Sequence, residues 1–211
     1  MIHVLQHPEP PEFAALVSAP GANWLALHPV RKTKEAMPPH WRKGMPQLRK
    51  AYKGICAYFC CYVKPATGGS STDHYAAKSK QRSDTYAWAN YRFACTRMNS
   101  RKRDSADVMD PFLLADGWFE LYFPTMRVRA SAHLLPADLK KVRATTRRLN
   151  LNSPECRSER EEAWSNYIEG APAAQLVRYA PFIALEAVRQ GFLKPADGDV
   201  TRATIRTFLD S

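Results

Sequence analysis

An acidic residue directly before a histidine, followed by two spaced asparagines, is the part of this sequence whose side chains suit chemistry. Asp73 precedes His74, and Asn90 and Asn99 follow the histidine after sixteen and a further nine residues. Cations such as Mg²⁺ prefer carboxylate and amide oxygens, so Asp73 and Asn99 are candidate metal ligands. A neutral imidazole can accept a proton from water, which suits His74 as a general base, with Asn90 fixing the loop that aims it. The pattern predicts a hydrolytic site with one divalent metal ion.

Short secondary-structure elements are expected to position these side chains. The apolar run over residues 55–63 and the segment 70–74 predict a hairpin, with two glycines near its turn. A basic loop would follow, and then a helix over residues 90–103 that carries Asn99 on its inner face. Strand, strand and helix would then surround one ion, which would neutralise the charge on a phosphate under attack. We therefore interpret the pattern as a nuclease site.

Three segments also carry a resemblance to a known family: Thr72-Asp73-His74-Tyr75, Tyr86-Ala87-Trp88-Ala89-Asn90, and Cys95-Thr96-Arg97-Met98-Asn99-Ser100-Arg101-Lys102. At these residues the sequence resembles the HNH endonucleases, whose core is a ββα-metal fold. The resemblance implies that Asp73 and Asn99 are metal ligands. It also implies that His74 is the general base and that Asn90 orients it. The implied cofactor is Mg²⁺ or Mn²⁺.

The resemblance extends beyond these segments. Residues 41–123, residues 180–184 and residues 189–191 look like the small HNH nucleases of bacterial anti-phage defence operons. Relatives of the Septu and retron type act beside an ATPase. The resemblance therefore implies an ATPase partner protein from the same defence system.

One departure from the family concerns zinc. Many HNH proteins hold a structural zinc ion with two C-x-x-C pairs, and the corresponding positions here are Cys56 with Phe59, and Cys95 with Met98. The outer cysteine of each pair is thus an apolar residue, as expected if packing has replaced the metal. We predict no structural zinc. A shifted ligand set that uses Cys60 or Cys61 stays open.

The charge balance favours a polyanionic partner. Lys and Arg number 31 against 20 Asp and Glu, which gives a net charge of +11. Contacts to phosphates would supply affinity that does not depend on base sequence. Ordinary solvated charge is the alternative, but together with the catalytic pattern the balance points to DNA or RNA. The candidate nucleic-acid contacts are Lys78, Lys80, Arg82, Arg97, Arg101 and Lys102.

The number of cysteines and the hydropathy of the chain indicate the cellular compartment. The chain has five cysteines, an odd number that does not suit a secreted disulfide framework. It has neither a signal-peptide pattern nor a run of about 18 apolar residues. We expect a cytoplasmic protein with no membrane partner.

The segments predict an α+β protein in three parts. Residues 1–50 form a basic N-terminal arm, residues 51–125 form the nuclease core, and residues 126–211 form a helical C-terminal subdomain. In the last part, Ser153 before Pro154 marks a helix start. A further helix is expected over residues 173–190, divided or kinked at Pro181.

Other functions are compatible with the same residues. An Asp-His pair is commonly a surface turn, and asparagines commonly cap helices and form turns. A catalytically inactive HNH fold retained as a DNA-binding or assembly subunit, a standalone restriction-like nuclease, and a basic RNA-binding protein are the alternatives. The sequence leaves the strand preference and cleavage sequence open, and a homodimer is suggested only by the need to cut two strands.

Overall fold

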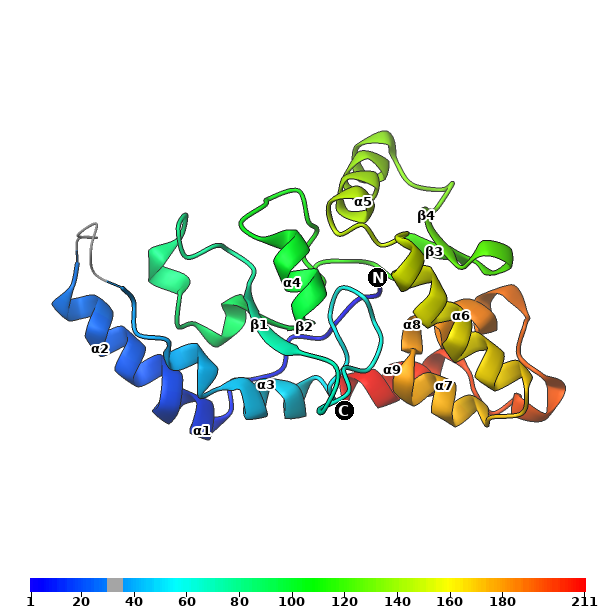
Figure 1. The fold of residues 1–211 in the computed structure, drawn as a ribbon, viewed down its shortest axis with the longest axis horizontal. Helices are drawn as coiled ribbons and strands as arrows, with labels where there is room; N and C mark the ends of the chain where they lie inside the picture. The colour runs from blue at the N-terminus through cyan, green and yellow to red at the C-terminus, as the bar shows by residue number, and fades with distance from the viewer. Residues whose placement is uncertain (30–35) are drawn as a thin grey trace.

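The computed structural model describes residues 1–29 and 36–211. Arg31, Lys32 and Lys34, which belong to the predicted basic N-terminal arm, lie outside the described residues. The N-terminal helices form one end of an elongated molecule and the C-terminal helices form the other, with a small sheet and α4 between them (Figure 1). The main elements in chain order are α1 (Pro11–Phe13), α2 (Ala19–Leu27), α3 (Met45–Ala51), β1 (Ser70–His74), β2 (Tyr91–Cys95), α4 (Thr96–Lys102), β3 (Phe119–Tyr122), β4 (Arg127–Ala130), α5 (Pro136–Arg148), α6 (Pro154–Ile168), α7 (Ala173–Tyr179), α8 (Pro181–Gln190) and α9 (Arg202–Asp210). This mixture of helices and small antiparallel sheets is an α+β fold.

A helical run at the N-terminus packs against the chain beside the predicted site. Helix α1 leads through a π-helical stretch, η1 (Ala14–Ser18), directly into α2. Phe13 is fully buried, with its ring centroid 4.7 Å from that of Trp88. Gly21 allows α2 to approach the Tyr86 ring closely, because a Cβ atom at residue 21 would lie 2.1 Å from Tyr86 Cγ.

The strands β1 and β2 pair directly and lead into α4. They are antiparallel, and the register sets Asp73 opposite Arg92 and His74 opposite Tyr91. The helix predicted over residues 90–103 is therefore wrong in its first part, since residues 91–95 form a strand and α4 starts at Thr96. Pairing with β1 gives these residues backbone hydrogen bonds that a helix would otherwise supply.

The predicted hairpin between residues 55–63 and β1 is absent from the described residues. Residues 55–63 instead form a compact loop with one isolated bridge, between Ile55 and Tyr62. The Ala57 amide donates to the Phe93 carbonyl at 2.8 Å, which ties the loop to β2. The apolar run is largely buried, but the prediction that it forms a strand of a hairpin is wrong. Cys60 adopts a φ of 61°, which turns the chain back on itself.

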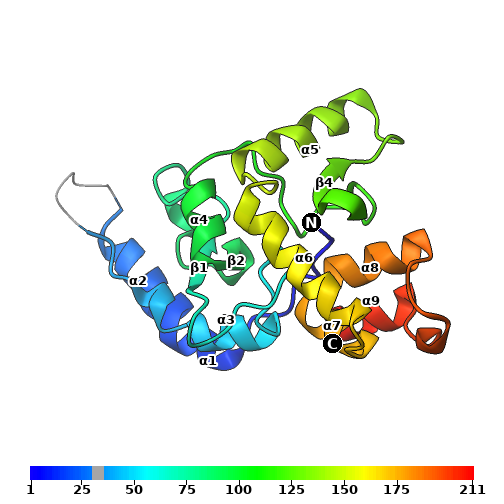
Figure 2. The ribbon, with the colours of Figure 1, turned by 45° about the vertical axis from the view of Figure 1, so that its right-hand side comes forward.

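The second small sheet and the C-terminal helices complete the fold (Figure 2). Strands β3 and β4 are antiparallel, with Phe119 opposite Ala130. Pro181 separates α7 from α8, and Gly191, with a φ of 71°, ends α8, so the prediction of a helical region divided at the proline is confirmed. Buried residues from all three predicted parts of the chain join one hydrophobic cluster. Among the described residues, no helix is both long and apolar enough to cross a bilayer.

A buried ion pair joins β2 to the segment that follows α4. Arg92 donates from Nε and Nη2 to the two carboxylate oxygens of Asp110, at 2.8 and 2.6 Å. The side chains of Arg92 and Asp110 are 3% and 10% exposed. Arg92 also lies over the Phe112 ring, with 3.5 Å from Cζ to the ring centroid. The pair therefore fixes the strand opposite Asp73.

Replacing the acidic partner is expected to leave a buried guanidinium without its counter-charge. We predict that Asp110→Ala lowers the free energy of unfolding by about 3 kcal/mol, measured by urea denaturation. The matched control is Asp138→Ala, because Asp138 pairs with an exposed Lys141 on α5, and its loss is expected to cost about 1 kcal/mol or less. Equal effects of the two substitutions would contradict this prediction.

Candidate active site

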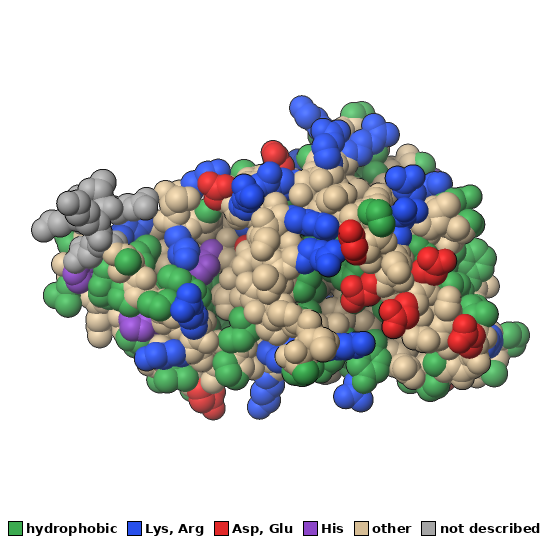
Figure 3. Space-filling view, viewed as in Figure 1, with side chains coloured by type: hydrophobic (Ala, Val, Ile, Leu, Met, Phe, Trp, Pro, Cys, Tyr) green, Lys and Arg blue, Asp and Glu red, His purple; other side chains and the backbone are tan. Residues whose placement is uncertain are grey.

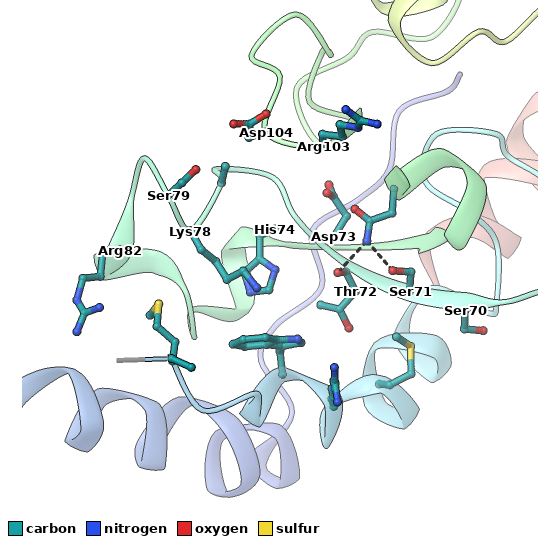
Figure 4. Close-up of a pocket in the computed structure, with 17 residues that line it drawn as sticks. Ser70, Ser71, Thr72, Asp73, His74, Lys78, Ser79, Arg82, Arg103 and Asp104 are labelled. Carbon is teal, nitrogen blue, oxygen red and sulfur yellow. Dashed lines mark hydrogen bonds between the residues drawn. The ribbon is translucent and has the colours of Figure 1, made fainter. Parts of the chain in front are cut away.

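The end of β1 opens into a cavity of about 860 Å³. Asp73, His74 and Asn99, which the sequence analysis placed in one site, all line this cavity. The opposite wall comes from residues 36–45, and the loop after β1 closes one side (Figure 4). The structure therefore brings together three of the four residues predicted for catalysis and metal binding. Asn90 is not among the residues that line the cavity, and its side chain instead binds the loop after β1, at Ala76 and Asp84.

The His74 imidazole is held in one orientation. Its ring lies between those of Trp41 and Tyr91, at centroid distances of 5.1 and 4.9 Å. His74 Nε2 lies 3.0 Å from the carbonyl oxygen of Thr85. A carbonyl can only accept, so Nε2 carries the proton, and the lone pair of the neutral ring is on Nδ1. The structure thus leaves Nδ1 as the basic atom of this ring.

The electrostatic surroundings keep the His74 ring neutral. Burial lowers the pKa of His74 to about 3, and the ammonium of Lys78 contributes in the same direction. The hydrogen bond to the Thr85 carbonyl acts in the opposite direction. At neutral pH the ring therefore carries no charge, and Nδ1 has an unprotonated lone pair.

Asn90 holds the loop that supplies this carbonyl. Its Oδ1 accepts from the Ala76 amide at 2.7 Å, and its Nδ2 donates to the carbonyls of Ala76 and Asp84, each at 3.0 Å. Asp84 immediately precedes Thr85. One buried amide side chain therefore closes the loop between His74 and its hydrogen-bond partner.

The Asp73 carboxylate is buried and bound by two protein donors. Lys102 Nζ lies 3.2 Å from Oδ1, and the Tyr58 hydroxyl donates to Oδ2. Both oxygens therefore act as acceptors, which is the behaviour of the ionised group. Burial raises the pKa of the Asp73 carboxyl, and the Lys102 charge opposes this shift. Each oxygen keeps a second lone pair, and the residue lines the cavity.

Asn99 presents an oxygen to the same cavity. Its Nδ2 donates to Ser71 Oγ at 2.5 Å and to the Thr72 carbonyl at 3.3 Å (Figure 4). With the amide nitrogen engaged in this way, Oδ1 has no hydrogen-bond donor among the residues that the structure describes. Strand β1 therefore sets which end of the Asn99 amide is available.

These oxygens fit a hard divalent cation. Mg²⁺ is commonly held by one or two protein oxygens, with water and substrate phosphate completing its shell. The Asp73 carboxylate and Asn99 Oδ1 line one cavity and match this donor set. In residues 1–29 and 36–211, no three His, Cys, Asp or Glu side chains are grouped as a metal site. The candidate ligands of a cation in this cavity are Asp73 and Asn99.

The residues predicted to contact nucleic acid occupy different places. Lys78 and Arg82 line the cavity, and exposed Lys80 donates to the Asp104 carbonyl at its edge. Arg97 lies on another cavity, 3.5 Å from Glu155. The expectation fails for two residues of α4, which line neither cavity, are not exposed, and have cationic groups that bind other parts of the chain.

The first of these residues is Arg101, whose Nη1 donates to the carbonyls of Leu149 and Asn150 at 3.1 Å. The second is Lys102, which is fully buried at Asp73 and does not reach the surface. These two cations at the end of α4 are therefore structural. Spacing along a helix does not show whether a cation faces solvent or the neighbouring segment.

Sequence reasoning missed four residues of the site. Arg42 and Arg103 add two cations to the cavity, while Trp41 contacts His74 and Tyr58 contacts Asp73. The basic residues around Arg42 were a sequence signal for Arg42, and the Arg-Lys-Arg run at residues 101–103 was a signal for Arg103. Nothing in the local sequence indicated that Tyr58, fifteen residues before Asp73, would bind it.

The positions discussed for zinc lie together on the other side of α4. The Cys95 amide donates to Cys56 Sγ at 3.3 Å, and Phe59 and Met98 are buried beside the two cysteines. The apolar residues therefore occupy the places where the family pattern has its outer cysteines. The absence of a structural zinc stays a prediction.

A scan against protein-family models and a search of curated proteins found no match to this chain. Membership in the HNH family therefore stays a prediction from the sequence. The function is argued below from the arrangement of the side chains.

Removing the Asn90 amide is expected to loosen the loop behind His74. In Asn90→Ala the Ala76 amide loses its acceptor, so we predict at least about tenfold faster hydrogen exchange at Ala76 and a loss of about 2 kcal/mol in unfolding free energy. Asn23→Ala, at an exposed position of α2, is the control and should change neither. Unchanged exchange at Ala76 in Asn90→Ala would show that another contact holds the loop.

Proposed function

We propose that this chain is a metal-dependent endonuclease of the HNH type that hydrolyses phosphodiester bonds of DNA. The observation that carries the proposal is the orientation of His74, whose Nε2 is bound to Thr85 so that the lone pair is on Nδ1, in a residue that lines the same cavity as Asp73 and Asn99. A strand, a strand and a helix in this order position the three residues. The ATPase partner and the role in anti-phage defence stay predictions from the resemblance.

The charge on the cavity wall supports an anionic substrate. Four cationic side chains line it, while its acidic residues are Asp73, which is already paired with Lys102, and Asp104. The four are Arg42, Lys78, Arg82 and Arg103. A phosphodiester would offset this excess of positive charge. On the face drawn in Figure 3, Lys and Arg side chains extend across the middle and upper surface.

The chemistry assigned to the chain is in-line hydrolysis. His74 Nδ1 accepts a proton from water as the water oxygen attacks phosphorus, and the bond from phosphorus to the 3′ oxygen breaks. The Thr85 carbonyl holds the Nε2 proton throughout, so the ring becomes an imidazolium without changing its orientation. Trp41 and Tyr91 keep the ring from rotating away.

Asp73 and Asn99 are assigned to the cation that the family pattern implies. When bound, Mg²⁺ or Mn²⁺ would neutralise charge on the phosphate and the leaving oxygen. The Lys102 charge favours the ionised form of Asp73, and Ser71 engages Asn99 Nδ2, which leaves Oδ1 for the cation.

A second candidate function follows from the same contacts. Both Asp73 oxygens already bind protein donors, Tyr58 and Lys102, as expected of a carboxylate that stabilises the fold. An inactive HNH-type subunit that binds DNA through the cationic cavity would have this arrangement. An assay of DNA cleavage distinguishes this inactive subunit from the enzyme.

The first test is cleavage of supercoiled plasmid DNA by the full chain, with and without Mg²⁺ or Mn²⁺. We expect metal-dependent nicking that His74→Ala reduces by at least about 100-fold, because the general base is lost. His133→Ala, at an exposed loop position, is the control and should cleave as the wild type does. Circular dichroism would check that each variant is folded.

An additional variant tests the cation assignment. Asn99→Ala should require a higher metal concentration for half-maximal cleavage, because it removes one oxygen ligand. An unchanged metal requirement would take Asn99 out of the ligand set. Binding of DNA with no cleavage by any of these proteins would favour the inactive subunit.

A separate prediction concerns DNA affinity. Lys78→Ala and Arg82→Ala should each weaken DNA binding and reduce the slope of log affinity against log salt by about 1, as expected when one phosphate contact is lost. Arg178→Ala, at an exposed position of α7, is the matched control. Fluorescence anisotropy at several salt concentrations measures the slope, and an identical slope in all four proteins would remove both residues from the interface.

A further inference from the structure

A second cavity, of about 1000 Å³, lies on the other side of α4. It shares no lining residue with the cavity beside His74. Its wall is formed by the loop over residues 56–69, the first turn of α4, and the helices α6 and α7. Four of the chain's five cysteines line it, namely Cys56, Cys61, Cys95 and Cys156. The proposed nuclease uses none of them.

Two of these cysteines are in direct contact. The Cys95 amide donates to Cys56 Sγ at 3.3 Å, and the two thiols are close enough to share a hydrogen bond. The backbone fixes their approach, because the Ala57 amide donates to the Phe93 carbonyl at 2.8 Å. The Phe59 amide also donates to Cys56 Sγ, at 3.4 Å. A bond between the sulfur atoms therefore needs little movement of the main chain.

The surroundings shift the pKa values of the Cys56 and Cys95 thiols in opposite directions. The hydrogen bond from Cys56 lowers the pKa of Cys95 to about 7, with burial acting in the opposite direction. Burial raises the pKa of Cys56 and Cys61 well above the usual value. Cys95 is also partly exposed, whereas the other four cysteines are buried. The attacking thiolate is therefore expected at Cys95, with Cys56 as the resolving thiol.

We propose that Cys95 and Cys56 form an oxidation site for small hydroperoxides such as hydrogen peroxide, in which Cys95 reacts first and Cys56 then closes a disulfide. This inference does not rest on the proposed nuclease activity. The partial exposure of Cys95 in the cavity favours a small oxidant.

The reaction runs in two steps. The Cys95 thiolate attacks one peroxide oxygen, the oxygen–oxygen bond breaks, and Cys95 becomes a sulfenic acid while hydroxide leaves and takes up a proton. The sulfur loses two electrons and the peroxide gains them. Cys56 sulfur then attacks Cys95 sulfur, the sulfur–oxygen bond breaks, and the departing hydroxide leaves with the Cys56 proton as water. Two thiols and one hydrogen peroxide give one disulfide and two waters.

The disulfide would join the loop over residues 56–69 to the start of α4. Linking residues 39 positions apart in the chain restricts the unfolded state and stabilises the fold. The helix that carries Asn99 would be held at its first turn.

The test treats the reduced full chain with hydrogen peroxide, blocks remaining thiols, and maps peptides without reduction. We expect a linked pair of peptides containing Cys56 and Cys95, a higher midpoint of thermal unfolding, and reversal of both by dithiothreitol. A disulfide that forms instead between Cys60 and Cys61, or between Cys61 and Cys156, would overturn the proposal. This peptide map uses the wild-type chain, so its result does not depend on the folding of any variant.

Two variants assign the roles of the sulfurs. In Cys56→Ser, dimedone should trap a sulfenic acid at Cys95, and no Cys95 disulfide should form within the chain. Cys156→Ser, a cysteine of the same cavity, is the matched control and should keep the Cys56–Cys95 linkage. In the untreated wild type, iodoacetamide should label Cys95 at least roughly tenfold faster than Cys61 at neutral pH. Equal rates of labelling would show that Cys95 is not the attacking thiol.

Discussion

The buried ammonium group of Lys102 is the contact on which the candidate site depends. From the last residue of α4 it reaches the Asp73 carboxylate at 3.2 Å and the main-chain oxygens of His74 and Tyr75 at 3.1 and 3.0 Å. A buried charge is tolerated only when it is paired and its donors are satisfied, and three acceptors match the three N–H donors of an ammonium. Because the acceptors follow one another along the chain, Lys102 fixes the end of β1. The position of the His74 backbone follows from this contact.

The same end of α4 is held from outside by the C-terminal part of the chain. The Lys102 carbonyl, at the end of α4, accepts from the Ser105 amide at 3.2 Å and from the Arg148 guanidinium at 3.3 and 3.1 Å. Arg101 binds main-chain carbonyls between α5 and α6. The run of basic residues that resembled a nucleic-acid contact is therefore partly a junction between the core and the C-terminal helices. Charge in the sequence shows how many cations there are, and packing decides which of them face solvent.

Helix α4 also lies between the two cavities. Asn99 and Arg103 line the cavity beside His74, whereas residues 95–98 line the cavity with the cysteines. A short helix presents neighbouring residues to different sides, since each residue turns by about 100° from the one before it. The acidic side chains around α6, including Glu155, Glu159 and Glu162, lie at the second cavity. Cationic and acidic surroundings thus lie on opposite sides of one element.

The sequence by itself determined features that depend on neighbours in the chain. These include the end of α7 before Pro181 and the end of α8 at Gly191, since proline lacks an N–H and glycine tolerates positive φ. It also singled out Asp73, His74 and Asn99, which line one cavity. Tertiary structure decided that residues 91–95 form a strand, that Tyr58 binds Asp73, and that Lys102 is buried. The physical reason is that each of these outcomes depends on a partner far along the chain, and local propensity contains no information about that partner.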